Sequence, residues 1–203
     1  DIFQTFFNFV GIFFVIYMIG YASFLFLSVV VGSSTLYGLK RRNMLKNELP
    51  SDYYIPVSVI VPAHNEAVTI EATVRSLLAL QYKVYEIIVV DDGSTDTTAD
   101  VVREHFHMRH VNRPIQRSLH CQPEEAVYES RSFKVPITLI CKRNGGKADS
   151  LNMGINASRY PYFLCLDADS VLQSDSLEKI VRPVLEDDRV VAVGGAVRPG
   201  NGA

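Results

Sequence analysis

Polar side chains follow three apolar runs of this 203-residue sequence, at the point where each run ends. The three clusters are His64-Asn65-Glu66, Asp91-Asp92-Gly93 and Asp167-Ala168-Asp169. Five of these side chains are carboxylates, and unpaired carboxylates that lie close together raise one another's pKa. We therefore expect a cation or a ligand rich in hydrogen-bond donors to compensate them.

The Asp167-Ala168-Asp169 cluster points to metal chemistry. Two carboxylates separated by one small residue at the end of a strand can point to the same side. Their oxygens are hard ligands of the kind that Mg²⁺ or Mn²⁺ prefers, and a diphosphate can fill the remaining coordination positions. We predict Asp167 and Asp169 as ligands of such an ion.

Asp91 and Asp92 end the second apolar run. An ionised carboxylate only accepts hydrogen bonds, so it suits the N3–H group of uracil and rejects cytosine, which presents an acceptor there. The alternative is that one of the two carboxylates caps the helix that follows.

Lys147 follows Asn144-Gly145-Gly146 and is expected near the same edge of the fold, where it could reach a nucleotide or a phosphate as a point charge. The alternative is an ordinary surface lysine. This stretch lacks the GxxxxGK[ST] spacing of a phosphate loop, and no GxGxxG follows the first predicted strand. Nucleotide hydrolysis of the P-loop type and dinucleotide binding are therefore not supported.

The elements that must position these residues alternate between strands and helices. Runs of consecutive β-branched and apolar residues predict buried parallel strands at 57–63, 86–92, 137–141, 162–169 and 190–197. Apolar residues at helical spacing predict helices over roughly 68–80, around Val101–Phe106, over 148–157 and around Leu177–Leu185. This alternation predicts an α/β fold with a mostly parallel sheet, whose carboxyl ends gather the polar clusters at one edge. Residues 107–134 show no sustained period and are expected to form an insertion.

The N-terminal part of the sequence has a different character. Residues 2–39 contain no Asp, Glu, Lys or Arg, which is too long for an ordinary core helix and favours a transmembrane helix. A cleaved signal peptide is disfavoured because no basic segment precedes the run. Lys40, Arg41, Arg42 and Lys46 follow it, which predicts that the C-terminal part is cytosolic. We expect a membrane anchor at 1–39, a basic and polar linker at 40–56 and one domain at 57–203.

Four segments, taken together and in order, resemble the glycosyltransferase family 2 motifs on the GT-A, Rossmann-like fold. They are VSVIVPAHNE, IIVVDDGSTD, NGGKADSLNMGI and FLCLDADS. The likeness covers about residues 57–200. It is strongest to membrane-anchored bacterial polysaccharide synthases of the cellulose, chitin, hyaluronan and poly-N-acetylglucosamine type.

The resemblance implies roles for particular residues. The aspartates at 167 and 169 match the DxD motif, with Asp169 the more direct metal ligand, and His64 stands where many members carry an aromatic residue such as Tyr. The residues implied to bind the nucleotide-sugar are Pro62, Ala63, Asn65, Glu66, Asp91 or Asp92 at the uracil, Lys147, Asp167 and Asp169.

The resemblance also implies an activity: an inverting, metal-dependent transfer of a sugar from a UDP-sugar to a polysaccharide or lipid-linked acceptor, at the cytosolic face of the cell membrane. Members of the family supply an acidic general base in a T/G-E-D motif and a later QxxRW-like motif, and neither is present in these 203 residues. We therefore expect a donor-binding half that is inactive by itself, with no nucleic acid among its partners. The alternatives are a polyprenyl-phosphate glycosyltransferase and a non-catalytic, membrane-tethered nucleotide-binding module.

Overall fold

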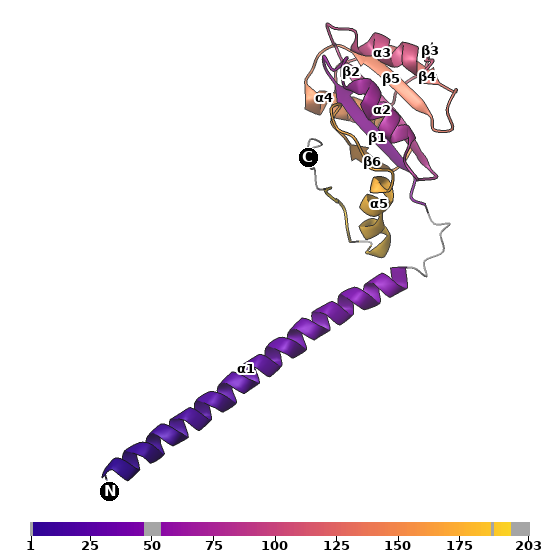
Figure 1. Cartoon of the computed structure of the whole chain (residues 1–203). Helices are drawn as coiled ribbons and strands as arrows, with labels where there is room; N and C mark the ends of the chain where they lie inside the picture. The colour runs from indigo at the N-terminus through magenta and orange to yellow at the C-terminus, as the bar shows by residue number, and fades with distance from the viewer. Residues whose placement is uncertain (1, 47–53, 188, 196–203) are drawn as a thin grey trace. The chain divides into compact units, whose positions relative to one another are not determined.

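The computed structural model describes residues 2–46, 54–187 and 189–195 (Figure 1). The chain divides into two compact units, Asp1–Tyr53 and Tyr54–Ala203. The first unit contains helix α1 (Ile2–Lys46), and the second contains all the other elements. Residues 40–46 of the predicted linker thus continue the helix, whereas residues 47–53 lie outside the described residues.

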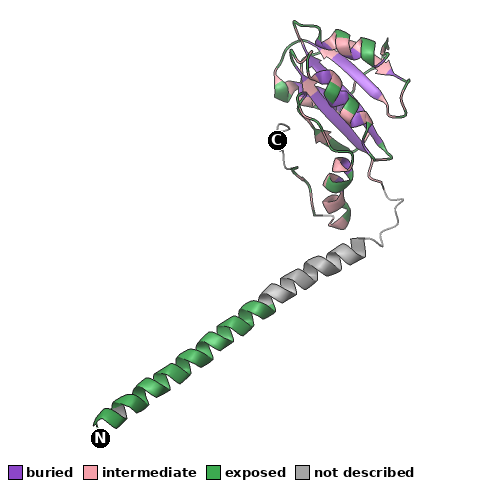
Figure 2. Cartoon of the chain, viewed as in Figure 1, coloured by how far each residue is buried: buried purple, intermediate pink, exposed green. Residues whose placement is uncertain are grey.

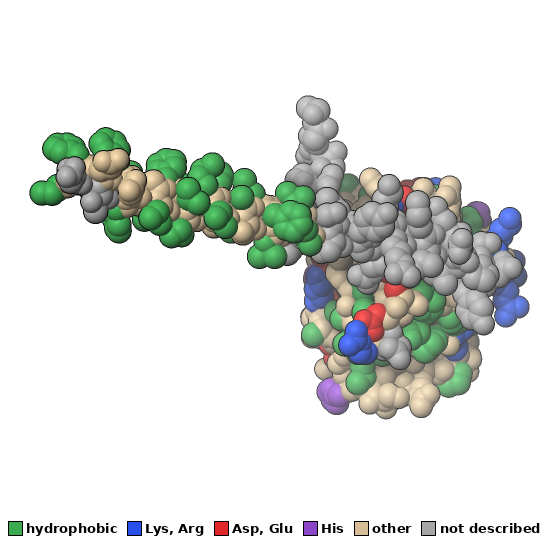
Figure 3. All heavy atoms as spheres, turned by 90° about the horizontal axis from the view of Figure 1, so that it is seen from below, with side chains coloured by type: hydrophobic (Ala, Val, Ile, Leu, Met, Phe, Trp, Pro, Cys, Tyr) green, Lys and Arg blue, Asp and Glu red, His purple; other side chains and the backbone are tan. Residues whose placement is uncertain are grey.

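Helix α1 carries the charge-free stretch. Its segment Ile2–Val30 is long and apolar enough to cross a membrane, by length and composition alone. Figure 3 shows hydrophobic side chains along the described part of this helix, and Figure 2 shows that they are exposed within the unit. The hydroxyl groups of Ser23 and Ser28 donate hydrogen bonds to the carbonyl oxygens of Ile19 and Phe24, at 2.8 and 2.9 Å. Both hydroxyls are therefore satisfied within the helix, as apolar surroundings would require.

The second unit is a six-stranded sheet with helices on both faces. Its strands are β1 (Val57–Ala63), β2 (Tyr85–Asp92), β3 (Arg109–His110), β4 (Glu124–Ser130), β5 (Ile137–Lys142) and β6 (Tyr162–Cys165). Its helices are α2 (Ile70–Leu78), α3 (Thr98–His105), α4 (Lys147–Ala157) and α5 (Ser176–Glu186). The strand order is β3-β4-β5-β2-β1-β6; β5, β2, β1 and β6 run parallel, and β3 and β4 pair antiparallel at one edge. The predicted α/β class is confirmed.

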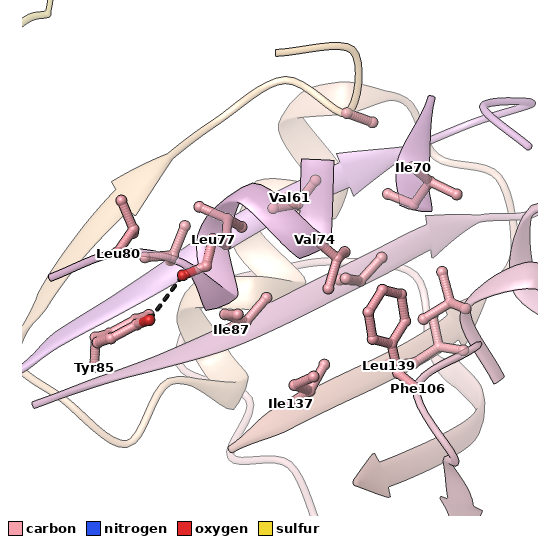
Figure 4. Close-up of a cluster of buried hydrophobic side chains, with 14 of the residues drawn as sticks. Val61, Ile70, Val74, Leu77, Leu80, Tyr85, Ile87, Phe106, Ile137 and Leu139 are labelled. Atoms are coloured by element: carbon pink, nitrogen blue, oxygen red, sulfur yellow. Dashed lines mark hydrogen bonds between the residues drawn. The ribbon is translucent and has the colours of Figure 1, made fainter. Parts of the chain in front are cut away.

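Alternate residues of the central strands enter two separate cores. Val59 and Val61 pack with residues of α2, α3 and α5, as the close-up of this cluster shows in part (Figure 4). Ile60 packs on the opposite face with Met153 of α4. Because both faces of β1 and β2 are covered, these strands read as continuous apolar runs rather than alternating ones. The hydroxyl of Tyr85, within the first core, donates a hydrogen bond to the Leu77 carbonyl at 2.7 Å.

Residues 107–134, expected as an insertion without a sustained period, contain two strands. This interval contributes strands β3 and β4, which extend the sheet beyond β5. Strand β4 reads EEAVYES, and most of its side chains are only partly buried. Among the described strands, only the two-residue strand β3 lies outside β4. A strand of an antiparallel pair that is solvated on one side carries polar residues there, so β4 lacks the apolar run that revealed the central strands.

Two predicted strands also differ from the structure. Strand β6 ends at Cys165 rather than at residue 169, and most of its residues are exposed, because it lies at the edge of the sheet and pairs with β1 alone within the described part of the chain. The predicted strand at 190–197 is wrong over its described part, since residues 190–195 have no regular secondary structure. They pair with none of the described strands, and an extended segment without a partner makes no sheet hydrogen bonds. Residues 196 and 197 lie outside the described residues.

Candidate functional site

A pocket of about 280 Å³ lies at the carboxyl ends of β1, β2 and β6. Its lining is Pro62, Ala63, His64, Glu66, Asp92, Lys147, Ser150, Asp167, Ala168 and Asp169. The structure therefore brings together all the residues that the sequence analysis placed at a nucleotide-sugar site, except Asn65 and Asp91. His64, Ser150 and Ala168 join them.

The Asp167-Ala168-Asp169 segment follows edge strand β6. Ala168 is buried, whereas the two aspartates on either side of it are exposed and both line the pocket. The Leu166 N–H group donates to the Ile60 carbonyl at 3.0 Å, which extends the contact with β1 by one residue past β6. The burial of the small middle residue thus leaves two carboxylates available on the pocket side.

Helix α2 holds the segment that follows these aspartates. The Thr73 hydroxyl donates a hydrogen bond to the Ala168 carbonyl at 2.7 Å. The Ser76 hydroxyl accepts one from the Leu172 N–H group at 3.3 Å, and the N–H group of Gln81, just after α2, donates to the Ser174 carbonyl at 2.8 Å. The backbone of residues 168–174 is thereby held along the helix, from the residue between the two aspartates onward.

Lys147 is the first residue of helix α4 and follows Gly146, whose φ of 90° lies in a region that L side chains rarely adopt. Its ammonium lies 2.5 Å from Oδ1 of Asp167. The hydrogen bond to Asp167 raises the pKa of Lys147, so the side chain is charged at neutral pH. The pocket therefore contains a cation beside the carboxylate pair.

Asp92 also lines the pocket, but its carboxylate has several partners of its own. It forms an ion pair with the buried Lys142, and it accepts hydrogen bonds from the N–H groups of Gly145 and Gly146 at 2.9 and 2.8 Å. Burial alone would raise the pKa of Asp92, but these hydrogen bonds lower it overall. Asp92 thus ties the end of β2 to the turn that precedes Lys147.

Lys142 was missed by the sequence analysis. It is the last residue of β5 and is almost fully buried, with its ammonium 2.8 Å from Oδ2 of Asp149 and in contact with Asp92. Burial alone would lower the pKa of Lys142, but the hydrogen bonds to Asp149 and Asp92 raise it. A lysine that ends an apolar strand is the one available signal, and it is a weak one, since most lysines are exposed.

The side chain of Asp91 points to a different side of the strand from that of Asp92. Its carboxylate is buried, accepts a hydrogen bond from the Ser94 hydroxyl and does not line the pocket. Burial raises the pKa of Asp91. The alternative that one of these two aspartates caps the next helix is wrong: Thr97 is the residue before α3, and Asp96 accepts the Thr98 N–H group at 2.9 Å.

Asn65 joins two loops instead of lining the pocket. Its φ of 57° is left-handed, and its Oδ1 accepts hydrogen bonds from the N–H groups of Thr95 and Asp96 at 2.8 and 3.3 Å. The adjacent Glu66 N–H group donates to the Thr98 hydroxyl at 2.8 Å. These bonds fix the loop after β1 against the loop after β2. Asn65 therefore supports the loop that carries the lining residues His64 and Glu66 without lining the pocket itself.

His64 has a defined tautomer. Its Nδ1 lies 2.9 Å from the carbonyl oxygen of Asp92, and because a carbonyl only accepts, Nδ1 carries the proton. In the neutral ring Nε2 is then an acceptor, and the Asn65 amide nitrogen lies 3.3 Å from it. The ring is thus oriented by the same loop contact that Asn65 supports.

The carboxylate pair fits a divalent cation held jointly with a ligand. Among the described residues there is no group of three or more His, Cys, Asp or Glu side chains placed to hold a metal ion. Asp167 and Asp169 would supply two oxygen ligands, and the other coordination positions would be filled by a bound ligand or water. Mg²⁺ sites are commonly built in this way, from one or two carboxylates together with phosphate oxygens of the substrate.

A mostly parallel sheet with a pocket at its carboxyl edge is the arrangement expected of a GT-A glycosyltransferase. The chain belongs to glycosyl transferase family 2: the profile of that family, "Glycosyl transferase family 2", matches residues 58–120 and 124–202. The match confirms the resemblance that the sequence motifs indicated. It also confirms that the chain is a glycosyltransferase sequence.

Two curated relatives are poly-beta-1,6-N-acetyl-D-glucosamine synthases. The one from Staphylococcus aureus strain COL is 29% identical over 185 residues, and the one from Staphylococcus epidermidis strain ATCC 35984 is 27% identical over 185 residues. Each alignment covers 90% of this chain and 39% of the relative, so the chain spans about two fifths of the length of these relatives.

A solved structure is also similar, the mannosyltransferase PcManGT from Pyrobaculum calidifontis in complex with GDP-Man and Mn²⁺. It is 25% identical to this chain with a TM-score of 0.51, and the match covers 75% of this chain and 40% of the mannosyltransferase.

Proposed function

We propose that this chain is the donor-binding part of an inverting glycosyltransferase that transfers a sugar from a UDP-sugar to a growing polysaccharide. The observation that carries the proposal is the pocket in which Asp167, Asp169 and Lys147 meet at the carboxyl edge of the sheet. The names of the staphylococcal relatives support a polysaccharide product, and the GDP-Man and Mn²⁺ bound by the mannosyltransferase support a nucleotide-sugar donor with a divalent cation.

In this proposal each part of the pocket has a role toward the donor. Asp167 and Asp169 hold Mg²⁺ or Mn²⁺, and the ion, when bound, stabilises the charge of the departing diphosphate. Lys147 adds a positive charge to the same phosphates. Pro62, Ala63 and Glu66 border the nucleotide.

The base is proposed to be uracil, read by Asp91 or Asp92. Asp92 is the one that lines the pocket, whereas the carboxylate of Asp91 accepts a hydrogen bond from Ser94 and does not line it. Asn65 is proposed to border the nucleotide as well, and its amide oxygen holds the loops after β1 and β2 together.

Transfer also requires a base that takes the proton of the acceptor hydroxyl. None of the pocket residues is proposed for that role; we assign it to a region of the parent protein other than these 203 residues. The segment 1–39 is proposed as a membrane anchor, with the domain 57–203 at the cytosolic face, supported by the apolar length of Ile2–Val30 and the basic residues after it.

The proposal is tested by calorimetric titration of the full chain in detergent with UDP, with and without Mn²⁺. We expect binding that requires Mn²⁺ and weakens at least about tenfold in Asp169→Ala, which corresponds to about 1.4 kcal/mol. The matched control is Asp175→Ala, which removes the carboxylate of the residue before α5; this carboxylate pairs with Lys179 and does not line the pocket.

Three outcomes would contradict the proposal in different ways. Absence of UDP binding by folded protein overturns the donor site. Equal binding of UDP, GDP and CDP overturns the assignment of uracil but not of the diphosphate. Donor binding by a full-length parent that transfers no sugar favours the non-catalytic module.

A further inference from the structure

Lys142 lies at the carboxyl edge of the sheet but does not line the pocket. Its ammonium contacts Asp92, lies 2.8 Å from Oδ2 of Asp149 and donates to the Arg143 carbonyl at 2.8 Å. A buried ammonium is costly unless it is paired and its N–H groups are used. Here its three donors have three partners, so the position of Lys142 is fully specified.

The two carboxylates that Lys142 joins enclose the turn before α4. Asp92 accepts the N–H groups of Gly145 and Gly146 from one side. On the other side, a Cβ added at Gly145 would lie 2.6 Å from the Asp149 carboxyl carbon, so the turn packs directly against that carboxylate. The turn that delivers Lys147 is therefore held between two groups that share one buried cation.

Asp149 also connects this cluster to a second segment, Ser118–Gln122, which we call the strap. Its carboxylate oxygens accept the Gln122 N–H group at 3.0 and 3.1 Å. Asn152 donates to the His120 carbonyl at 3.0 Å, and Asn156 exchanges hydrogen bonds with the backbone of Leu119, both at 2.8 Å. Asp149, Asn152 and Asn156 share one face of α4, so the strap fixes the helix at its N-terminus and along its length.

We propose that Lys142 is a positioning residue for the donor diphosphate: by holding Asp92 and Asp149 together it fixes the Gly145-Gly146 turn and sets Lys147 beside Asp167. The inference rests on the proposed function. Lys142 reaches no ligand itself, but each of its two carboxylate partners contacts either the pocket or the turn that leads to it.

The test is a double-mutant cycle on the affinity of the full chain for UDP in the presence of Mn²⁺. Lys142→Met alone is expected to weaken the binding of UDP about tenfold. In a chain that already carries Lys147→Met, the same substitution is expected to weaken binding further by at most about twofold. If Lys142 acts through Lys147, the losses of binding free energy in the two single variants are not additive. If Lys142→Met only destabilises the fold, the two losses add. Lys142→Arg, which keeps the charge, is expected to restore part of the affinity.

Lys179→Met is the matched control, because it removes a lysine that pairs with an exposed aspartate outside the pocket. Should Lys142→Met fail to fold, the same cycle is run with Asp149→Asn, which keeps the shape and halves the charge that faces Lys142. Additive losses, or an unchanged affinity in the single variant, would overturn the inference. If the unmodified chain does not bind UDP, the proposed function fails. This result is distinguishable from a failure of the inference about Lys142, because it is obtained without any substitution.

Discussion

The ammonium of Lys147 lies 2.5 Å from Oδ1 of Asp167, so one member of the carboxylate pair is paired with a cation supplied by the helix that follows the glycine turn. Both side chains are largely exposed. A lysine has a flexible stem and a compact charge, and it can change partners within its reach. We infer that Lys147 passes from Asp167 to a phosphate oxygen when the donor binds.

Lys147→Met should therefore weaken binding of UDP in the presence of Mn²⁺ by about tenfold, the value of one charge-assisted contact. Because the pKa of Lys147 is raised by its hydrogen bond to Asp167, the lysine stays protonated and its contribution should not change between pH 7 and 9. Calorimetry at these two pH values measures both effects. Tighter binding in Lys147→Met would show that the lysine competes with the metal ion and would contradict the role assigned to it.

Asn65→Ala should destabilise the domain by about 1–3 kcal/mol, because the N–H groups of Thr95 and Asp96 lose their acceptor and a non-glycine residue without a local hydrogen bond is left at φ 57°. Asn65→Asp keeps the acceptor oxygen and tolerates the left-handed conformation, so it should cost less. Urea unfolding of the two variants measures the difference. Equal losses would mean that the shared oxygen does not hold the loops together.

Gly154→Ala tests the packing of α4 on the sheet. A Cβ at this position would overlap the Cγ2 atom of Ile60, so the substitution should destabilise the domain by about 1–3 kcal/mol. At an open helical site the same change would stabilise the protein by about 1 kcal/mol. The sign of the change in the free energy of unfolding therefore shows whether α4 packs this closely on the sheet. Gly194→Ala is the control, since no atom lies near its added Cβ.

Asp91 and Asp92 should affect the pH dependence of stability in opposite directions. The lowered pKa of Asp92 contributes stability that is present above its unfolded value, about 3.9, and is lost as the pH falls through the folded value. The raised pKa of Asp91 contributes stability that is present below its unfolded value and is lost as the pH rises through the folded value.

Urea unfolding of Asp91→Asn and Asp92→Asn at several pH values between 3 and 7 measures both effects. Relative to the unmodified chain, Asp92→Asn should be less stable at pH 7 than at pH 3. Asp91→Asn should improve over the same interval. Parallel curves for the two variants would contradict the different surroundings that the structure gives these neighbours.

The central strands could be predicted from the sequence because burial on both faces leaves one strong signal, a run of β-branched residues. The prediction of 57–63 coincides with β1, and that of 86–92 misses only Tyr85 of β2. Strand β4 gave no such signal, since it lies beside the two-residue edge strand β3, is only partly buried and mixes polar and apolar residues. Residues 190–195 show the converse: an apolar run becomes a strand only where a neighbouring strand pairs with it.

The gathering of the polar clusters followed from the fold class, because parallel strands end at a common edge. Which side chain of each cluster faces the pocket did not follow. Asp91 and Asp92 are adjacent in one strand and therefore point to opposite sides, and the sequence does not say which side is which. The role of Asn65 depends on a loop 30 residues away in sequence, and Lys142 is recognisable only once its two buried partners are in place.

Helix α2 influences the pocket although none of its side chains lines it. Its residues Thr73 and Ser76 form hydrogen bonds with Ala168 and Leu172. The aspartates follow an edge strand, which has a neighbouring strand on one side only. Helix α2, rather than a second strand, therefore fixes the position of the segment that carries them. Thr73 stands 95 residues before Ala168, and a change at Thr73 would move the carboxylate pair while leaving each of its atoms intact. Helix α2 therefore sets the position of the carboxylate pair, which we propose as the metal ligands, without contacting a ligand itself.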